Sequence, residues 1–167
     1  MVEKNVVFSS KIKYEGIFSF ADFYKFCYDY ITEELDFGVA ENEYSEKLKG
    51  DTKELAIEWE GEIKITDYFK YVIKVNFLIF NLANIEVQQE GKKKKTNKGI
   101  LSVAVKGTMV SDYDGKYETS PMLRFFRGVY EKWIIPSKIE QIEEKLISDC
   151  DDFLSQAKAY LALEGKK

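Results

Sequence analysis

The chain has 167 residues, of which 45% are hydrophobic and 32% are charged, a balance typical of a single globular domain spanning 1–167. Its net charge of −4 and its two arginines argue against a nucleic-acid partner, because such binding needs clustered positive charge that includes arginine. The absence of histidine removes the commonest general acid–base and metal ligand, which argues against zinc sites and against Ser–His or Cys–His nucleophiles.

No apolar run approaches the ~18 residues of a membrane span, and the N-terminus has no apolar run of the kind that a signal peptide needs. We therefore expect a cytoplasmic protein with no membrane span. Cys27 and Cys150 fall on the apolar stripes of two expected helices, which favours two buried thiols. A disulfide that joins the two helices is the alternative.

The N-terminal region predicts one strand followed by one helix. Alternating apolar and polar residues indicate a half-buried strand over 5–14. Ser19 is expected to cap a helix, with Asp22 as its capping-box partner, and Gly38 is expected to end it. The apolar stripe of this helix, at three- and four-residue spacing, comprises Phe20, Phe23, Cys27, Tyr30, Ile31 and Leu35.

The middle of the chain predicts an antiparallel sheet. A weaker strand covers roughly 39–48, and apolar and polar residues then alternate along 54–65 and 69–79. A three-residue loop at 66–68 keeps the apolar faces together, whereas a two-residue turn would mix them. We therefore expect Ile63 opposite Tyr71, Trp59 opposite Val75, Ile57 opposite Phe77 and, on the outer face, Glu60 opposite Lys74.

The rest of the β block is predicted to contain one more hairpin. We expect a turn at 81–84, a strand that starts at Ile85, a hairpin tip at 96–99 and a return strand over 101–109. These segments bring the sheet to about six strands. Phe77–Phe80 is apolar on both faces, so this strand end is either covered on both sides or meets another subunit.

The C-terminal part predicts helices. Ser120 and Pro121 suit the N-cap and the first position of a helix, and Pro136 requires a kink or break. A second capping box, formed by Ser137 and Glu140, is expected to open the long terminal helix. The apolar stripe of that helix comprises Ile139, Ile142, Leu146, Cys150, Phe153, Ala157 and Leu161.

Together these elements predict an α+β fold, in which a single antiparallel sheet packs against an N-terminal helix and a long, proline-broken C-terminal helix. The order of strand, helix, antiparallel β block and long C-terminal helix resembles the helix-grip fold of START-type lipid-transfer proteins and the plant pollen-allergen superfamily. The resemblance is one of topology and covers nearly the whole chain. It implies that the curved sheet wraps the last helix and leaves an apolar cavity.

The expected interface between the sheet and the C-terminal helix is the first candidate site. Six residues expected there are candidates for holding an apolar or lipid-like small molecule, because ligand pockets are mainly apolar with a few polar anchors. They are Trp59, Tyr71, Phe77, Met109, Tyr130 and Trp133. The alternative is that these residues fill an ordinary close-packed core.

The segment 121–135 is the second candidate site, because it holds Arg124 and Arg127 among large aromatic and aliphatic residues. Arginine and aromatic residues are enriched at interface hot spots, so this segment is a candidate interface, including that of a homodimer. The alternative is a core helix whose arginines pair with carboxylates at the rim of the sheet. The lysines of 92–98 indicate either an anion-binding patch or a solvated hairpin tip.

No motif indicates a catalytic residue, a metal site or a cofactor. The glutamates of 54–65 fit the polar face of a strand, and Asp112–Gly115 resembles the opening of a calcium loop without the glutamate that such a loop needs. The sequence therefore favours a non-enzymatic binding protein for an apolar ligand. A self-associating or scaffold protein that uses 121–135 is the alternative, and a histidine-free enzyme is the third reading.

Overall fold

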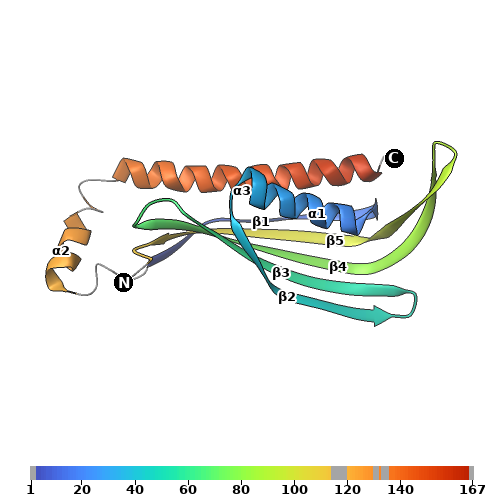
Figure 1. The fold of residues 1–167 in the computed structure, drawn as a ribbon, viewed down its shortest axis with the longest axis horizontal. Helices are drawn as coiled ribbons and strands as arrows, with labels where there is room; N and C mark the ends of the chain where they lie inside the picture. Colours follow the sequence, from blue (N-terminus) through green and yellow to red (C-terminus); the bar gives the residue numbers. More distant parts are fainter. Residues whose placement is uncertain (1–2, 114–119, 130–131, 133–135, 166–167) are drawn as a thin grey trace.

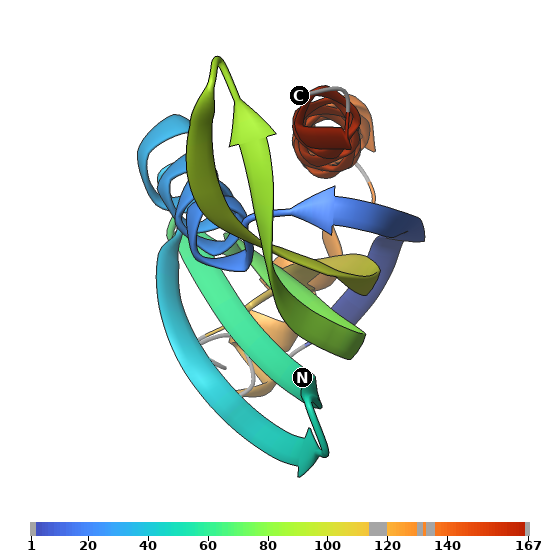
Figure 2. The same ribbon diagram turned by 90° about the vertical axis from the view of Figure 1, so that its right-hand side faces the viewer.

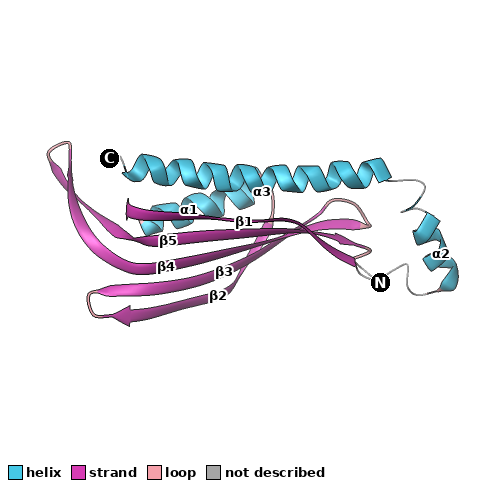
Figure 3. Ribbon diagram, turned by 180° about the vertical axis from the view of Figure 1, so that it is seen from behind, coloured by secondary structure: helices cyan, strands magenta, loops and turns pink. Residues whose placement is uncertain are grey.

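A computed structural model describes residues 3–113, 120–129, 132 and 136–165 of the chain. Within these residues, five strands form one antiparallel sheet in the order β1-β5-β4-β3-β2, and helices α1 and α3 lie on the same face of it (Figure 1). The view from behind in Figure 3 shows helix α2 beyond one end of the sheet. The predicted α+β architecture is confirmed. Its elements are β1 (Glu3–Phe18), α1 (Phe20–Asp29), the π-helical turn η1 (Tyr30–Glu34), β2 (Gly38–Lys49), β3 (Thr52–Lys64), β4 (Phe69–Gln89), β5 (Lys92–Ser111), α2 (Pro121–Val129) and α3 (Pro136–Gly165).

The hairpin of β3 and β4 has the predicted register. Its loop is held by Thr66, whose hydroxyl accepts hydrogen bonds from the backbone amides of Tyr68 at 3.1 Å and Phe69 at 3.0 Å. The loop length keeps the alternating apolar residues of the two strands, such as Ile57, Trp59 and Val75, on one face of the sheet. The confirmed pairs are Ile63 with Tyr71, Trp59 with Val75, Ile57 with Phe77 and Glu60 with Lys74.

The predicted turn at 81–84 is wrong, because β4 continues through this segment to Gln89. A β-bulge formed by Asn81 and Leu82 interrupts the pairing of β4 with β5. Asn81 has a positive φ of 55°, and Leu82 is buried, so residues with turn character bend the strand without ending it. Two of the expected strands are therefore one long strand, which is why the sheet has five strands rather than about six.

The predicted hairpin tip at 96–99 is also wrong. The tip lies at Glu90 and Gly91, whose φ values of 54° and 77° suit the two central positions of a two-residue hairpin turn. Because glutamate is an unusual residue for the first of these positions, the sequence signal for this tip is weak. Lys92–Lys95 consequently open β5 instead of leading toward a tip.

The first helix begins as predicted, since the Ser19 hydroxyl accepts a hydrogen bond from the backbone amide of Asp22 at 3.4 Å. The α-helix ends at Asp29 and continues as the π-helical turn η1 to Glu34. The helical segment therefore ends before Gly38, where its end is predicted. Three residues of the predicted stripe are fully buried, namely Phe23, Cys27 and Ile31. This stripe joins the helix to the core of the sheet.

The C-terminal part contains helices α2 and α3, and α3 begins at Pro136, where a kink or break is predicted; residues 133–135, just before it, lie outside the described part of the chain. Ser137 therefore lies inside α3, and the prediction that it caps the helix is wrong, because proline itself is well suited to the first helical turn. The predicted stripe is confirmed: Leu146, Cys150, Phe153, Ala157 and Leu161 are buried, and Ile139 and Ile142 pack against the core. None of the described helices combines the length and the apolarity that crossing a membrane demands.

Helix α3 packs closely on the sheet over β1 and β5, as the end-on view in Figure 2 shows. Gly107 of β5 lies directly beneath it, because a Cβ atom there would stand 2.9 Å from Cys150 Sγ and 3.3 Å from Leu146 Cγ. The Tyr71 hydroxyl donates a hydrogen bond of 2.6 Å to the backbone carbonyl of Ile142. Cys27 and Cys150 are both buried free thiols, as predicted, and burial raises the pKa of each thiol.

Candidate functional site

The structure places four of the six predicted ligand-binding residues together in the core. Trp59, Tyr71, Phe77 and Met109 are exposed by only 1%, 2%, 0% and 3%, and they belong to one cluster of buried side chains. The rings of Trp59 and Phe77 meet edge to face with centroids 4.7 Å apart. The other two residues of that prediction, Tyr130 and Trp133, lie outside the described residues. That this set holds a ligand stays a prediction.

The two predicted interface residues both lie on α2. Arg124 is exposed, and the side chain of Arg127 is outside the described part of the structure. Three apolar residues of the same helix are open to solvent: Met122, Phe125 and Phe126 are exposed by 68%, 67% and 52%. Within the described part of this segment, these three apolar side chains therefore lie on the surface.

The helix-bearing face of the sheet also has an open region between α1 and β2, which we call the aromatic groove. It consists of two adjoining hollows of about 540 Å³ and about 310 Å³, which share Tyr24 and Glu41 as wall residues. These volumes fall in the range of small-molecule sites. The residues that line the groove are Phe20, Ala21, Tyr24, Lys25, Tyr28, Val39, Glu41, Tyr44 and Trp59.

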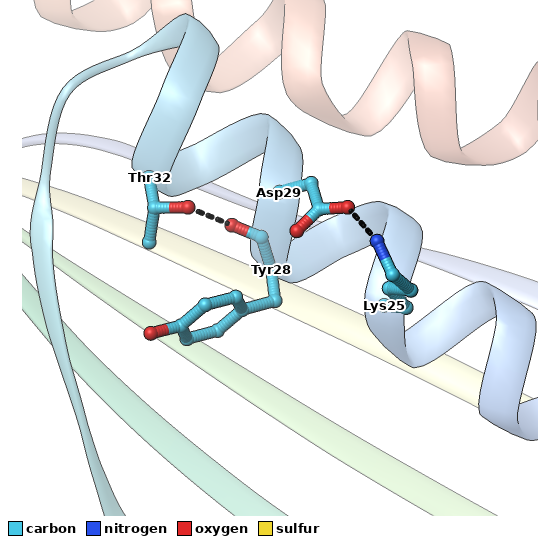
Figure 4. A network of polar contacts seen from close by, with 4 residues as sticks. All are labelled: Lys25, Tyr28, Asp29 and Thr32. Carbon is cyan, nitrogen blue, oxygen red and sulfur yellow. Dashed lines mark hydrogen bonds and ion pairs between the residues drawn. The ribbon is translucent and has the colours of Figure 1, made fainter.

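The helix wall of the groove follows from sequence spacing. Phe20, Tyr24 and Tyr28 are four residues apart along α1, so their side chains lie on one side of the helix. The ring centroids of Phe20 and Tyr24 are 5.7 Å apart, and the Tyr28 ring lies 5.8 Å from that of Trp59. Figure 4 shows the Tyr28 ring extending from α1 toward the strands. The groove therefore has a continuous aromatic wall.

The strand wall comes from β2, which is an edge strand of the sheet. Glu41 pairs with Trp59 and Tyr44 pairs with Ile57 across β2 and β3, so both project on the helix-bearing face. A β-bulge at Asn42 lies between them and keeps both on this face, because it adds one residue to the strict alternation. The Asn42 side chain itself donates a hydrogen bond of 3.0 Å to Glu60 on the other face.

A chain of hydrogen bonds fixes the centre of the groove. The Trp59 indole N–H donates to the Tyr24 hydroxyl at 2.9 Å, and the Tyr24 hydroxyl donates to Glu41 Oε2. Burial is the main cause that raises the pKa of Tyr24 to about 12, and the hydrogen bond to Glu41 is the second cause. Tyr24 therefore stays a neutral phenol that positions the Glu41 carboxylate, and the remaining acceptor capacity of that carboxylate faces the groove.

The one cation that lines the groove is already engaged within the described residues. Lys25 forms an ion pair of 2.5 Å with Asp29 one helical turn away, as drawn in Figure 4. The same view shows the Thr32 hydroxyl, which donates to the backbone carbonyl of Tyr28 at 2.8 Å. Because Lys25 has its own counter-ion, the Glu41 carboxylate is left as the groove's negative centre.

Among the residues of the aromatic groove, only Trp59 is a ligand-binding candidate from the sequence. The predicted apolar stripe of the helix contains Phe20 but not Tyr24 or Tyr28, although the spacing of these three aromatic residues indicates a second face of the same helix. Glu41 and Tyr44 belong to the segment that gave only a weak strand pattern. The bulge at Asn42 removes the alternation that would have revealed them.

Other charged candidates lie outside the groove. Lys92–Lys95 are exposed on β5, and the glutamates at 58, 60 and 62 line the opposite face of the sheet, as their alternation predicted. Among the residues that the structure describes, no cluster of three or more His, Cys, Asp or Glu side chains is arranged to hold a metal ion.

In comparisons with known proteins, no protein-family model, no curated protein and no solved structure matches the chain.

Proposed function

We propose that this chain is a non-enzymatic binding protein that holds a small organic molecule in the aromatic groove. The observation that supports this proposal is the placement of one carboxylate, Glu41, at the junction of two hollows walled by aromatic rings. Ligand sites in proteins typically combine an apolar lining with a few fixed polar groups. The groove has this composition, and its polar group is fixed by Tyr24.

The chemistry of the groove favours a ligand with an apolar or aromatic body and a protonated amine. Aromatic faces attract cations, and a carboxylate accepts a charge-assisted hydrogen bond from an ammonium group. Tyr44 and Tyr28 are exposed by 48% and 43%, so their faces are available to a ligand without any rearrangement of the core. The predicted apolar ligand is thus kept in this proposal, with its site moved from beneath α3 to the edge of the sheet.

Isothermal titration calorimetry with phenethylamine as the probe, and 2-phenylethanol as its neutral counterpart, tests this proposal. We expect the amine to bind more tightly than the alcohol. The Glu41→Gln variant should lose about tenfold or more in amine affinity, because it removes a charge-assisted hydrogen bond. The matched control is Glu43→Gln, which removes an equal charge from the same strand on the opposite face. Equal affinities of amine and alcohol, or equal losses in both variants, would contradict the proposal.

A second candidate function is self-association through α2. Its support is the exposure of Met122, Phe125 and Phe126 on one short helix, since exposed apolar patches commonly mark interfaces. Light scattering over a range of protein concentrations tests it: a dimer that Phe125→Ser converts to a monomer without loss of helix content would support this candidate. A monomer at all concentrations would count against it.

A further inference from the structure

The face of the sheet opposite the helices carries a second hollow, which we call the lysine hollow. It has a volume of about 360 Å³, and it crosses the strands between β1 and β3 near the end that bears the β3–β4 loop. This volume is sufficient for a small ligand. Tyr113 closes one side of it, and the Tyr113 hydroxyl is anchored by a hydrogen bond of 2.9 Å to the backbone carbonyl of Thr66.

The charge of the lysine hollow is opposite to that of the chain as a whole. Four lysines and two glutamates line it, which gives a local charge of +2 in a protein of net charge −4. The lysines are Lys4, Lys70, Lys74 and Lys106. This concentration of positive charge is an electrostatic feature that a solvated strand face does not require.

The register of the sheet places two of these lysines directly opposite each other. Lys74 of β4 and Lys106 of β5 are directly opposite partners on the same face. Like charges in such a position destabilise a sheet. Lys74 has Glu58 at 3.8 Å as a counter-ion, and Lys70 has Glu62 at 3.1 Å, whereas Lys106 has no ion pair with any residue that the structure describes. Among the described residues, the Lys106 ammonium group is therefore left without a counter-ion, at a position where an anion would relieve the repulsion.

The floor of the lysine hollow is apolar. Val6, Val72 and Val110 line it between the lysines. Val110 is already buried, whereas Val6 is exposed by 47% and Val72 is half-buried. A valine side chain that stays exposed on a sheet contributes little burial free energy unless something covers it. A ligand that satisfies both features has one anionic group for the lysines and a short apolar part for the valines.

From this juxtaposition we propose that the lysine hollow is a binding site for a small amphipathic carboxylate. The anionic oxygens lie between Lys74 and Lys106, and the apolar part covers Val6 and Val72. This site is separate from the aromatic groove and does not depend on the function proposed for it, since the two lie on opposite faces of the sheet.

NMR titration of ¹⁵N-labelled protein with octanoate tests the proposal, with 1-octanol as the uncharged probe. Octanoate should produce saturable shifts at the amides of the lysine hollow, and octanol should not. Lys106→Gln should weaken octanoate binding about fivefold, as expected for the loss of one unit charge at a distance of about 4 Å in a solvated site. The control is Lys13→Gln, an exposed lysine on the same face of β1 outside the hollow, which should change the affinity less than twofold.

The stability of the variant serves as an internal control. Because Lys106→Gln also removes a like-charge contact, the melting temperature of this variant should not fall. Weaker octanoate binding could then not be ascribed to unfolding. Absence of saturable shifts, equal shifts with octanol, or equal weakening by Lys13→Gln would overturn the proposal. Broadening of these amides by anionic phospholipid vesicles without any response to octanoate would overturn it in favour of a membrane surface.

Discussion

The helix-bearing face of the sheet has a closed region and an open region. Over β1 and β5, α3 approaches so closely that Gly107 has no room for a side chain beneath Cys150. Between α1 and β2, aromatic side chains line two hollows and Tyr44 is half exposed. Large aromatic residues on the inner face therefore have two roles in this fold: some fill the core under α3, and others line a groove at the edge of the sheet.

Truncation of a side chain in the closed region should have the largest effect. Leu146→Ala removes a fully buried side chain of α3 above Gly107 and should lower the free energy of unfolding by about 2–5 kcal/mol. The control is Ile147→Ala, the next residue of the same helix, which is partly exposed and should cost less than about 1 kcal/mol. Urea denaturation followed by circular dichroism measures both. Similar losses for the two variants would mean that α3 is not packed on the sheet in this orientation.

A smaller effect is expected where the closed region uses a polar contact. Tyr71→Phe removes the hydrogen bond to the Ile142 carbonyl and should cost about 1 kcal/mol at neutral pH. Burial raises the pKa of the folded Tyr71 to about 12 from its ordinary value of 10. The stabilisation that depends on the neutral phenol is therefore complete below pH 10 and is lost as the pH rises from about 10 to 12.

Denaturation measured at several pH values between 8 and 12 checks this pH dependence. The Tyr71→Phe variant should lose less stability over this range than the wild-type chain does. Part of the alkaline loss should remain in the variant, because the pKa values of Tyr24 and Tyr160 are also raised to about 12. Identical pH profiles for the two proteins would show that Tyr71 is not shielded from water as the structure indicates.

The smallest effect on stability is expected in the open region. Tyr44→Ala shortens a half-exposed side chain at the wall of the aromatic groove and should change the free energy of unfolding by no more than about 0.5 kcal/mol. The same denaturation experiment measures it. A loss above about 2 kcal/mol, the range of a buried side chain, would show that the groove is part of the core and not an open surface.

The closed region could be predicted from the sequence, and the open region could not. Strict alternation in β3 and β4 fixed the register to the residue, and three- and four-residue spacing located the buried stripe of α3. Both patterns are direct consequences of burial on one face. The aromatic groove depends instead on which surfaces α1 leaves uncovered, which is a matter of tertiary packing.

The wrong turn prediction at 81–84 and the missed groove residues of β2 both have local physical causes. Asn81 has a residue type that favours turns, but Leu82 is drawn into the core, and burial prevailed over local turn preference to give a bulge. Another bulge, at Asn42, hid Glu41 and Tyr44 by breaking the alternation of β2. Irregularities in β4 and β2 therefore account for the wrong strand count and for the missed strand wall of the aromatic groove.

The most direct test of the central claim, that ligand binds in the open region and not beneath α3, uses the indole N–H signal of Trp59. This group donates to Tyr24 at the floor of the aromatic groove, and a Trp133→Phe variant identifies its NMR signal among the two tryptophans. Phenethylamine should shift the Trp59 indole signal saturably and leave the amides of Leu146 and Tyr71 unchanged. Shifts at Leu146 and Tyr71 with an unchanged Trp59 indole signal would show that the ligand binds beneath α3 and not in the aromatic groove.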